Sequence, residues 1–485
     1  MNLLRYSFLF VPYVAAALVY TQPAMSYLIA WLGSWWILYL TLSGSVTPLP
    51  GGRSLVQQLY RPIGLTQIMF AGYTALSSIF FFVDLYGFYY LIPDATGVAE
   101  AGEFALAAEA QRYYVLIHAA FSVGVLSCMS YRTSGQYQLS GVVNLSWFLL
   151  YLAGGLFVAA QGIRLLSGLG QIEGRLDMLA LVASVLALAV AIMRRNTWPV
   201  FISGALYMLS VAQAFMSGWK SEVIVAFLLL AIFLYPRYKR SIAVATPVVL
   251  VMLFTLLPFY ADVVRDLSWR GDLGSQEAAR MAMEQTLSED APLMEKNWSF
   301  LTGRLSEIGM FVQYIDQVPE EQPFYRFELV ENGVIGLVPR IFWSDKPNME
   351  RLSMERVYAL GIADDHTAVS AKPKFVVDAF LSWGAWGVLL GGLLYGMLAS
   401  AASRLAERWF GGYLLGSGLV YTAFFREFWM SNSFEFFFNT ILWSFILMGG
   451  LFLLGRMSGY LVPAPAPSPP SAPSEPRKKR TAVFG

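Results

Sequence analysis

The 485-residue chain has 57% hydrophobic side chains, only 13% charged ones and a formal net charge of +1. Soluble globular domains carry about 25% charged residues, so this composition excludes a soluble enzyme, a disordered regulator and a secreted disulfide scaffold. The small net charge excludes a strongly basic nucleic-acid binder. One Cys and two His cannot supply an intrachain disulfide or a His-rich metal cage. We therefore expect an all-α, polytopic membrane protein with neither a metal ion nor a cofactor.

Membrane spans account for most of the chain. A spanning helix needs about 20 mostly apolar residues, and the sequence offers about twelve such segments. In chain order we place them near Tyr6–Tyr20, Ser26–Leu42, Leu65–Ile92, Tyr113–Tyr131, Val143–Gly162, Met178–Met193, Pro199–Met216, Val223–Tyr235, Ser241–Tyr260, Val376–Ser400, Gly412–Phe425 and Phe437–Leu454. Lys and Arg residues fall in every second connection, which predicts that both termini are cytoplasmic.

These spans divide the chain into four parts. We expect a membrane domain of about nine spans over residues 1–260 and a large periplasmic loop over residues 261–375, followed by further spans over residues 376–456. Residues 457–485 form a Pro-rich, basic tail that we expect to be disordered in the cytoplasm. The loop is far longer than an ordinary connection and contains helical patterns at Ser275–Leu287 and Phe300–Ile315. We therefore expect the chemistry there.

Cations are frequent on the predicted outer side. Arg offers a rigid fork of donors to phosphate oxygens and Lys a point charge, so several of them together would suit a lipid pyrophosphate. The alternative is that each cation pairs with one of the acidic residues of the loop. The candidate ligands are Lys220, Arg265, Arg270, Arg304, Arg340 and Lys346.

The segment Gly336–Pro347 combines two prolines with an aromatic pair. Pro339 and Pro347 fix the backbone on either side, and Arg340 and Lys346 flank the pair that contains Trp343. This pattern predicts a rigid elbow at the membrane surface with Trp343 in the interface. A membrane-docked loop with an aromatic anchor explains it equally well.

Small residues and one carboxylate mark the span that follows the loop. Glycines at three- and four-residue spacing predict close helix packing there: Gly384, Gly387, Gly391, Gly392 and Gly396. Asp378, at the outer mouth of this span, is costly unless it is paired or functional. His366, between Asp365 and Thr367, is a second candidate proton acceptor, with an exposed loop histidine as the alternative. No Walker, HExxH, CxxC or nucleophile-elbow motif occurs, so use of ATP or a nucleotide sugar is not expected.

Taken together, these motifs resemble the bacterial oligosaccharide repeat-unit polymerases, the Wzy-type O-antigen and exopolysaccharide polymerases. The resemblance extends over about Gly218–Gly396 and rests on three elements. These are the Gly-x-Lys turn before a Leu-rich span, the Pro-Arg-x-x-Trp-x-x-Lys-Pro element at 339–347, and Asp378 followed by Trp383-Gly384-Ala385-Trp386-Gly387. Such proteins often have Tyr-x-Asn-x-Gly at this place, whereas this chain has Phe-Leu-Ser-Trp-Gly at 380–384. The resemblance therefore assigns no role to an Asn here.

The resemblance implies glycosyl transfer at the periplasmic face of the bacterial inner membrane. Undecaprenyl-pyrophosphate-linked oligosaccharides would be joined without a metal, with the pyrophosphate stabilised by Lys220, Arg270, Arg304, Arg340 and Lys346. His366 or Asp378 would accept the proton of the acceptor hydroxyl. A polysaccharide chain-length regulator is an expected partner, together with the lipid bilayer and without nucleic acid.

Three alternatives stay open. An O-antigen ligase-like transferase differs only in its acceptor, lipid A–core. A flippase for lipid-linked glycans would place ionisable groups at mid-membrane and show internal repeats, neither of which is evident here. A structural subunit of an envelope complex would leave the outer arginines individually replaceable.

Overall fold

The computed structural model describes residues 2–48, 58–130, 135–165, 170–218, 220–271, 273–338, 343, 345–363 and 372–465. Within these residues the chain is predominantly helical. The elements in order are α1 (Asn2–Ser7), α2 (Val11–Leu18), α3 (Pro23–Leu42), η2 (Pro62–Thr66), α4 (Gln67–Ala71), η3 (Gly72–Leu76), α5 (Ile79–Leu85), β1 (Tyr86–Tyr89), β2 (Ile92–Val98), α6 (Ala101–Cys128), β3 (Tyr137–Leu139), α7 (Leu145–Arg164), α8 (Gly170–Arg194), α9 (Thr197–Met216), α10 (Lys220–Leu234), α11 (Lys239–Arg265), η4 (Asp266–Arg270), α12 (Ser275–Thr286), α13 (Leu293–Ser299), η5 (Phe300–Leu305), α14 (Ile308–Gln317), α15 (Glu328–Leu337), α16 (Met349–Ala359), α17 (Phe375–Trp409), η6 (Tyr413–Tyr421), α18 (Thr422–Phe424), α19 (Glu427–Met430), α20 (Phe434–Met457) and β4 (Leu461–Pro463), where η denotes a π-helical segment.

Eight helices of the described chain are long and apolar enough to cross a membrane. They are Pro23–Leu42, Pro62–Leu85, Leu145–Arg164, Ile172–Arg194, Thr197–Met216, Lys239–Ser268, Phe375–Trp409 and Phe434–Met457. Helices of this length and composition place the chain among helical membrane proteins, as the sequence predicts.

The other four expected spans correspond to helices that do not meet the same criteria. Helix α2 has 8 residues and α10 has 15. The apolar stretch Tyr413–Phe424 is short and mostly π-helical. Helix α6 has 28 residues but carries Glu103, Glu109 and Arg112 in its first half. By length and apolar composition, the described chain therefore shows eight candidate spans, and the expected number of twelve stays a prediction.

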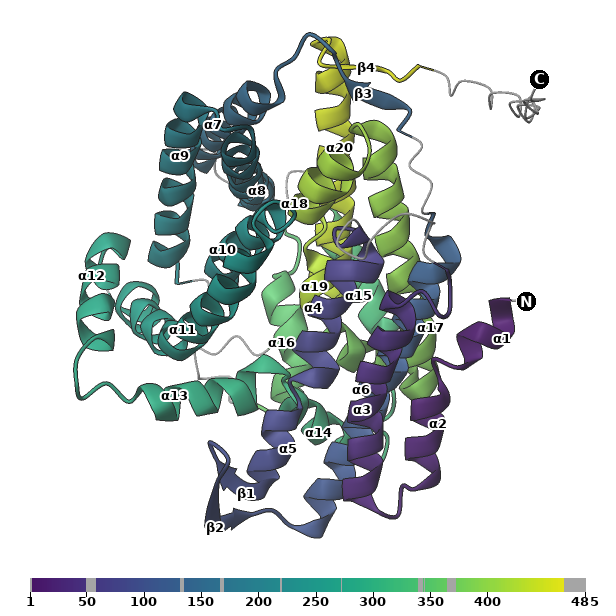
Figure 1. The fold of residues 1–485 in the computed structure, drawn as a ribbon. Coiled ribbons are helices and arrows are strands. Elements are labelled where there is room, and N and C mark those ends of the chain that lie inside the picture. The colour runs from purple at the N-terminus through teal and green to yellow at the C-terminus, as the bar shows by residue number, and fades with distance from the viewer. Residues whose placement is uncertain are drawn as a thin grey trace, which may run out of the picture.

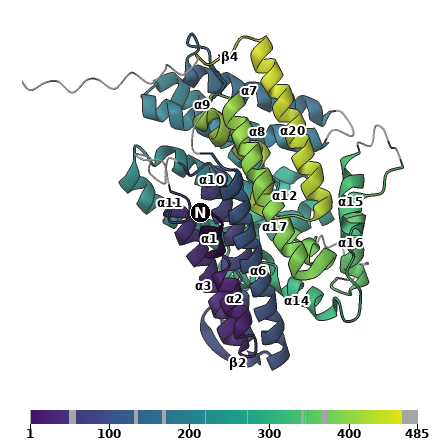
Figure 2. The ribbon, with the colours of Figure 1, turned by 90° about the vertical axis from the view of Figure 1, so that its right-hand side faces the viewer.

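The long helices form two neighbouring groups. Helices α3, α6 and α17 pack side by side, and α20 lies against α17 and α15 (Figures 1 and 2). Helices α7, α8 and α9 form the second group, which contacts the first through α8 and α18. The core is therefore built between helices that are far apart in the chain.

Close packing of α6 against α17 depends on glycine. A Cβ at Gly392 would lie 2.8 Å from Ala120 Cβ, and a Cβ at Gly396 would lie 2.8 Å from Val125 N. On the facing helix, a Cβ at Gly124 would lie 3.0 Å from Met397 N. The prediction that these glycines serve helix packing is confirmed for Gly392 and Gly396.

Two short β-ribbons interrupt the helical fold. Strands β1 and β2 form an antiparallel hairpin at the lower end of Figure 1, and β3 pairs with β4 at the upper end. Because Tyr137 pairs with Pro463 and Leu139 with Leu461, the first part of the expected tail is an ordered strand. Residues 466–485 lie outside the described residues.

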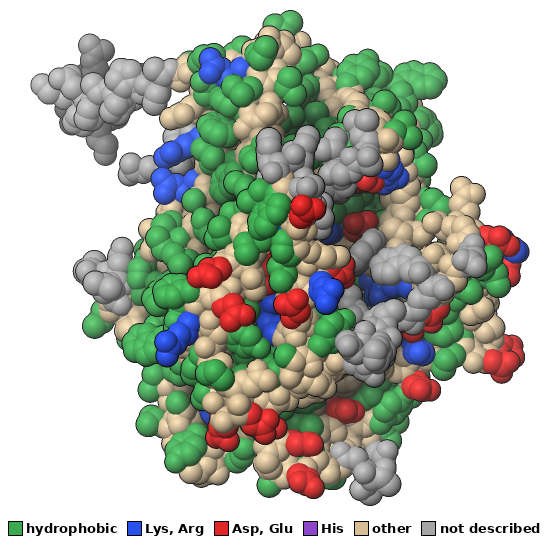
Figure 3. All heavy atoms as spheres, turned by 180° about the vertical axis from the view of Figure 1, so that it is seen from behind, with side chains coloured by type: hydrophobic (Ala, Val, Ile, Leu, Met, Phe, Trp, Pro, Cys, Tyr) green, Lys and Arg blue, Asp and Glu red, His purple; other side chains and the backbone are tan. Residues whose placement is uncertain are grey.

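The segment Ala261–Phe375 packs closely against the membrane helices. Helix α14 contacts α6, α15 contacts α20, and α13 contacts α11. Acidic side chains gather on the lower half of the rear face, whereas hydrophobic side chains dominate its upper part (Figure 3). We call the end of the molecule that holds β1, β2 and α12–α16 the loop end.

Candidate functional site

A half-buried lysine stands at the centre of the candidate site. Lys220 begins α10, and its Nζ lies 4.6 Å from the centroid of the Phe300 ring. The turn before it is closed by Arg265, whose Nε and Nη2 donate to Gly218 O at 3.4 and 3.3 Å. Gly218 has φ +71, a conformation that L side chains rarely adopt, which explains a glycine two residues before this lysine.

Other cations of the outer segment surround Lys220. The pKa of Lys220 is lowered to about 8, first by burial and then by Arg265, Arg304 and Lys296, while Asp262 opposes the shift. Asp262 is itself engaged, because its Oδ2 lies 3.2 Å from Lys296 Nζ. We call Lys220, Arg265, Lys296 and Arg304 the outer cationic cluster. Among the described residues Asp262 and the adjoining Glu307 are fewer than the four cations, so the cluster carries the net positive charge that a phosphate-bearing ligand needs.

Glu307 adjoins this cluster. It joins η5 to α14 with φ +56, an uncommon conformation for a residue with a side chain. Burial raises the pKa of Glu307, and Lys374 and Arg304 oppose that rise. A carboxylate with a raised pKa beside cations is suited to accepting a proton near neutral pH.

Lys374 holds the backbone around Glu307 in place. This lysine is 6% exposed, and its Nζ donates to Tyr73 O at 2.7 Å, Ser306 O at 3.0 Å and Leu305 O at 3.2 Å. Tyr114 Oη also donates to Ser306 O, at 2.9 Å. Because all three ammonium donors are used, Lys374 positions Glu307 rather than serving as a free ligand.

A second charged group lies deeper, between α8, α19 and α20. Burial raises the pKa of Glu427, and Arg175 and Arg426 oppose it. Arg175 Nη2 donates to Thr440 Oγ1 at 2.7 Å. Within the described residues, Arg175 Nε, Arg426 Nη1 and Glu427 Oε1 are buried without a hydrogen-bond partner. Such atoms are costly unless a ligand or water meets them.

The structure places Asp378 in a buried ion triad with Arg356 and Glu435. Arg356 Nη2 lies 2.8 Å from Asp378 Oδ2, and Arg356 Nη1 lies 2.9 Å from Glu435 Oε1. Phe434 N also donates to Asp378 Oδ2 at 2.8 Å. Asp378 and Glu435 are 0% exposed and Arg356 is 3% exposed. In this arrangement Asp378 joins α16, α17 and α20 through its Oδ2, whereas its Oδ1 is buried without a hydrogen-bond partner among the described residues. The proton-acceptor role expected of Asp378 stays a prediction, and its complete burial in an ion triad favours a structural role.

Lys346 and Trp343 are also separate from the outer cationic cluster. Lys346 Nζ donates to Gly336 O at 2.7 Å and Val338 O at 2.8 Å, so it closes the end of α15. Trp343 is 39% exposed. Three of the predicted site residues cannot be placed: Arg340 and His366 lie outside the described residues, as does the side chain of Arg270.

Comparison with known proteins gives one match. A family described as a domain of unknown function, DUF8712, matches residues 11–462. The chain belongs to the DUF8712 family. No curated protein and no solved structure matches it. The matched region runs from α2 to β4 and contains the outer cationic cluster, Glu307 and the buried triad, so all three lie in the unit that defines the DUF8712 family.

Sequence reasoning missed several charged residues of this DUF8712 chain. Arg356 and Glu435 are 79 positions apart, and nothing local links them. Glu435 did carry a signal, since a carboxylate in the first turn of an apolar span is expensive unless paired. Lys374, in the segment Lys372-Pro373-Lys374, has no sequence feature that would have predicted its role.

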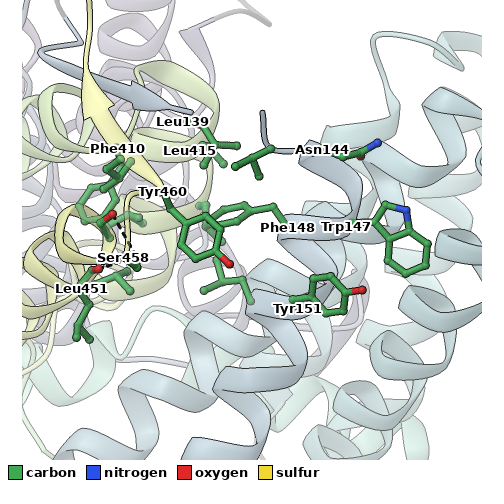
Figure 4. Close-up of a pocket in the computed structure, with 17 residues that line it drawn as sticks. Leu139, Asn144, Trp147, Phe148, Tyr151, Phe410, Leu415, Leu451, Ser458 and Tyr460 are labelled. Atoms are coloured by element: carbon green, nitrogen blue, oxygen red, sulfur yellow. Dashed lines mark hydrogen bonds between the residues drawn. The ribbon is translucent and has the colours of Figure 1, made fainter. Parts of the chain in front are cut away.

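An apolar cavity of about 600 Å³ lies at the other end of the DUF8712 fold (Figure 4). It opens between α7, the residue Phe410 that follows α17, and the helices η6 and α20, beside β3 and β4. Phe148, Tyr151 and Tyr460 are among its lining residues, and none of the residues that line it in the described chain is Lys, Arg, Asp, Glu or His. Its walls suit a hydrocarbon chain and offer no group for acid–base chemistry.

Proposed function

We propose that this DUF8712 protein polymerises lipid-pyrophosphate-linked oligosaccharides by glycosyl transfer at the outer face of a bacterial cytoplasmic membrane. The observation that supports this most is the outer cationic cluster, in which Lys220, Arg265 and Arg304 come together from three separate elements. In the reaction, the growing chain leaves its lipid pyrophosphate and bonds to a hydroxyl of an incoming unit. Cations at the departing pyrophosphate would stabilise the charge that develops on it.

Glu307 is the proposed proton acceptor, in place of Asp378. It stands next to Arg304 in the cluster, it is half-buried, and its pKa is raised above that of an ordinary carboxyl. Its left-handed backbone is held by the Lys374 contacts, and residues in such conformations concentrate at active sites. The hydroxyl proton would pass to a Glu307 oxygen as the new glycosidic bond forms.

The proposed topology has twelve crossings with both termini in the cytoplasm. It adds α2, α6, α10 and the stretch Tyr413–Phe424 to the eight apolar helices. Under this topology the Gly218–Lys220 turn and the Ala261–Phe375 segment lie on the same outer side, which agrees with their contact at the loop end. Polymerisation also requires the lipid bilayer as a partner, and a chain-length regulator would act from the same face.

The proposal can be tested by analysing lipid-linked glycans from host cells that lack the gene. Loss of polymerase activity leaves single repeat units on the lipid at the outer face. Complementation with Lys220→Gln, Arg304→Gln or Glu307→Gln should fail to restore long glycans, whereas Arg280→Gln should restore them. Arg280 is a matched control because it is 66% exposed and, within the part of the chain that the structure describes, its ion pair is with the exposed Glu284 of α12.

Other outcomes would favour other functions. Full-length glycans that stay on the lipid, with bare lipid A–core, would indicate a ligase. Single units trapped at the cytoplasmic face would indicate a flippase. Restoration by both Lys220→Gln and Arg304→Gln would remove the outer cationic cluster from the reaction, and restoration by Glu307→Gln would remove Glu307 as the proton acceptor.

A further inference from the structure

A second cavity of about 380 Å³ lies at the loop end, where α6 begins, α14 ends and α17 bends. Its aromatic lining consists of Tyr113, Phe324, Phe380 and Trp383. Its acidic lining consists of Glu109, Asp316 and Glu320. Neither the outer cationic cluster nor Glu307 contributes to it, so it is distinct from the site described above.

The aromatic wall exists because α17 is kinked. Trp383 and Gly384 leave the helical conformation, with Gly384 at φ +57. The kink frees two carbonyls of the helix, and the α14–α15 connection occupies them: Tyr325 N donates to Leu381 O at 2.9 Å and Arg326 N to Ser382 O at 3.1 Å. The α14–α15 connection and the bent helix α17 are therefore joined by hydrogen bonds and form one ordered wall of the cavity.

The rings of this wall are fixed by contacts with one another. Phe380 lies 4.9 Å from Tyr113 and 5.9 Å from Phe324, measured between ring centroids. Trp383 packs edge-on against Phe327 at 4.8 Å and stays 36% exposed. Several aromatic rings thus border one cavity with their positions set before any ligand binds.

The charge of the cavity is negative. Glu109 accepts a hydrogen bond from Tyr113 Oη at 3.0 Å and has one cation near it, Arg112 at 3.6 Å. Asp316 and Glu320 are exposed, and neither forms an ion pair within the described residues. A cavity bounded by carboxylates repels anions, and aromatic faces attract cations through the ring quadrupole.

We propose that this cavity binds an organic ammonium group. Aromatic faces with nearby carboxylates are the chemistry that recognises quaternary and primary ammonium ions. Two sources would present such a group at the loop end: an amino sugar of a glycan, or the amine headgroup of a membrane lipid. This inference does not rest on the proposed glycosyl transfer, because it concerns binding by a separate cavity.

Calorimetric titration of the full-length protein in nanodiscs with tetramethylammonium chloride tests the proposal, with sodium chloride at equal ionic strength as the blank. We expect saturable binding that the double variant Asp316→Asn/Glu320→Gln weakens by about tenfold. Both positions are exposed, so the variant should fold. The matched control Glu289→Gln/Asp290→Asn removes the same charges from an exposed turn after α12 and should bind as the wild type does.

Two further experiments identify the molecule that supplies the ammonium group. Competition by a glucosamine tetramer, but not by its N-acetylated form, supports an amino sugar. Weaker tetramethylammonium binding in phosphatidylethanolamine nanodiscs than in phosphatidylglycerol nanodiscs supports a lipid headgroup. Absence of saturable binding, or equal binding by the Asp316→Asn/Glu320→Gln variant, would overturn the proposal. Equal competition by the glucosamine tetramer and its N-acetylated form would also overturn it, because the ammonium would then not be recognised.

Discussion

Single residues decide what the outer cationic cluster can bind. Lys220 is half-buried among Arg265, Lys296 and Arg304, and its pKa is lowered to about 8 by burial and by these cations. Its charge is therefore present below pH 8 and lost as the pH rises through that value. An ordinary surface lysine would keep its charge throughout this range.

The affinity for a pyrophosphate ligand should follow this titration. We expect farnesyl pyrophosphate to bind about tenfold more weakly at pH 9 than at pH 7, because most Lys220 side chains are then neutral. Lys220→Arg should remove this pH dependence, since a guanidinium stays charged. Titration of the wild-type and Lys220→Arg proteins with farnesyl pyrophosphate between pH 7 and pH 9 measures the change in affinity. A parallel decline in the two proteins would show that Lys220 is not the titrating group.

Asp378, unlike Lys220, is a charged residue that we expect to stabilise the fold rather than to bind the ligand. Asp378→Asn should lower the free energy of unfolding by about 1–3 kcal/mol, because Arg356 Nη2 and Phe434 N lose a charged acceptor while Arg356 keeps its bidentate pairing with Glu435. Thermal unfolding followed by intrinsic fluorescence would measure this loss. Asp290→Asn, on an exposed turn, is the control and should unfold as the wild type does. An Asp378→Asn protein of normal stability that lacks activity would restore Asp378 as a catalytic candidate.

At the scale of elements, the α6–α17 contact sets how tightly the helices assemble. Gly396→Ala would place a Cβ against the backbone of Phe121 and Val125 and should cost about 1–3 kcal/mol. Gly450→Ala, in the middle of α20 with open space around it, should instead stabilise the protein by about 0.5–1 kcal/mol. Thermal unfolding of the two variants should therefore shift in opposite directions. Equal behaviour would mean that the glycine contact does not limit packing.

Elements also show where sequence reasoning succeeds. The last span was expected at Phe437–Leu454 and forms α20 at Phe434–Met457, because length and apolar composition are local properties. The stretch Tyr413–Phe424 was also found, but its π-helical turns were not, since they depend on packing against α17. The kink at Trp383 and Gly384 was missed for the same reason: its freed carbonyls are satisfied by residues 325 and 326 of another segment.

The candidate site was predictable only in part. Lys220, Arg265 and Arg304 were named from their residue types and expected side of the membrane, and the structure brings them together. The position of Asp378 in the buried triad could not be predicted from the sequence, because its partners Arg356 and Glu435 come from two other helices. Some cations can bind a ligand, whereas others, such as Lys346, close the end of a helix. The difference depends on tertiary contacts, which the spacing of residues in the sequence does not reveal.

For the whole molecule, the decisive question is which end faces outward. The proposed topology puts the loop end outside and the β3–β4 ribbon inside. In a Cys128→Ser background, Ser288→Cys should react with a membrane-impermeant maleimide in intact cells, because the turn after α12 is exposed. Ser458→Cys, exposed at the end of α20, should react only after permeabilisation. The reverse pattern would invert the topology and place the outer cationic cluster in the cytoplasm.

The Arg356–Asp378–Glu435 triad has a consequence for biosynthesis. Arg356 emerges from the ribosome well before Glu435, and the triad can close only after α20, the last membrane helix, has inserted. Until then the guanidinium lacks its bidentate partner and the outer segment lacks its attachment to α20. A nascent chain that stops before Phe434 would therefore leave Arg356 with Asp378 as its remaining triad partner and without the bidentate contact to Glu435. Such an incomplete ion triad is a signal that membrane proteases and chaperones could use to remove incomplete molecules.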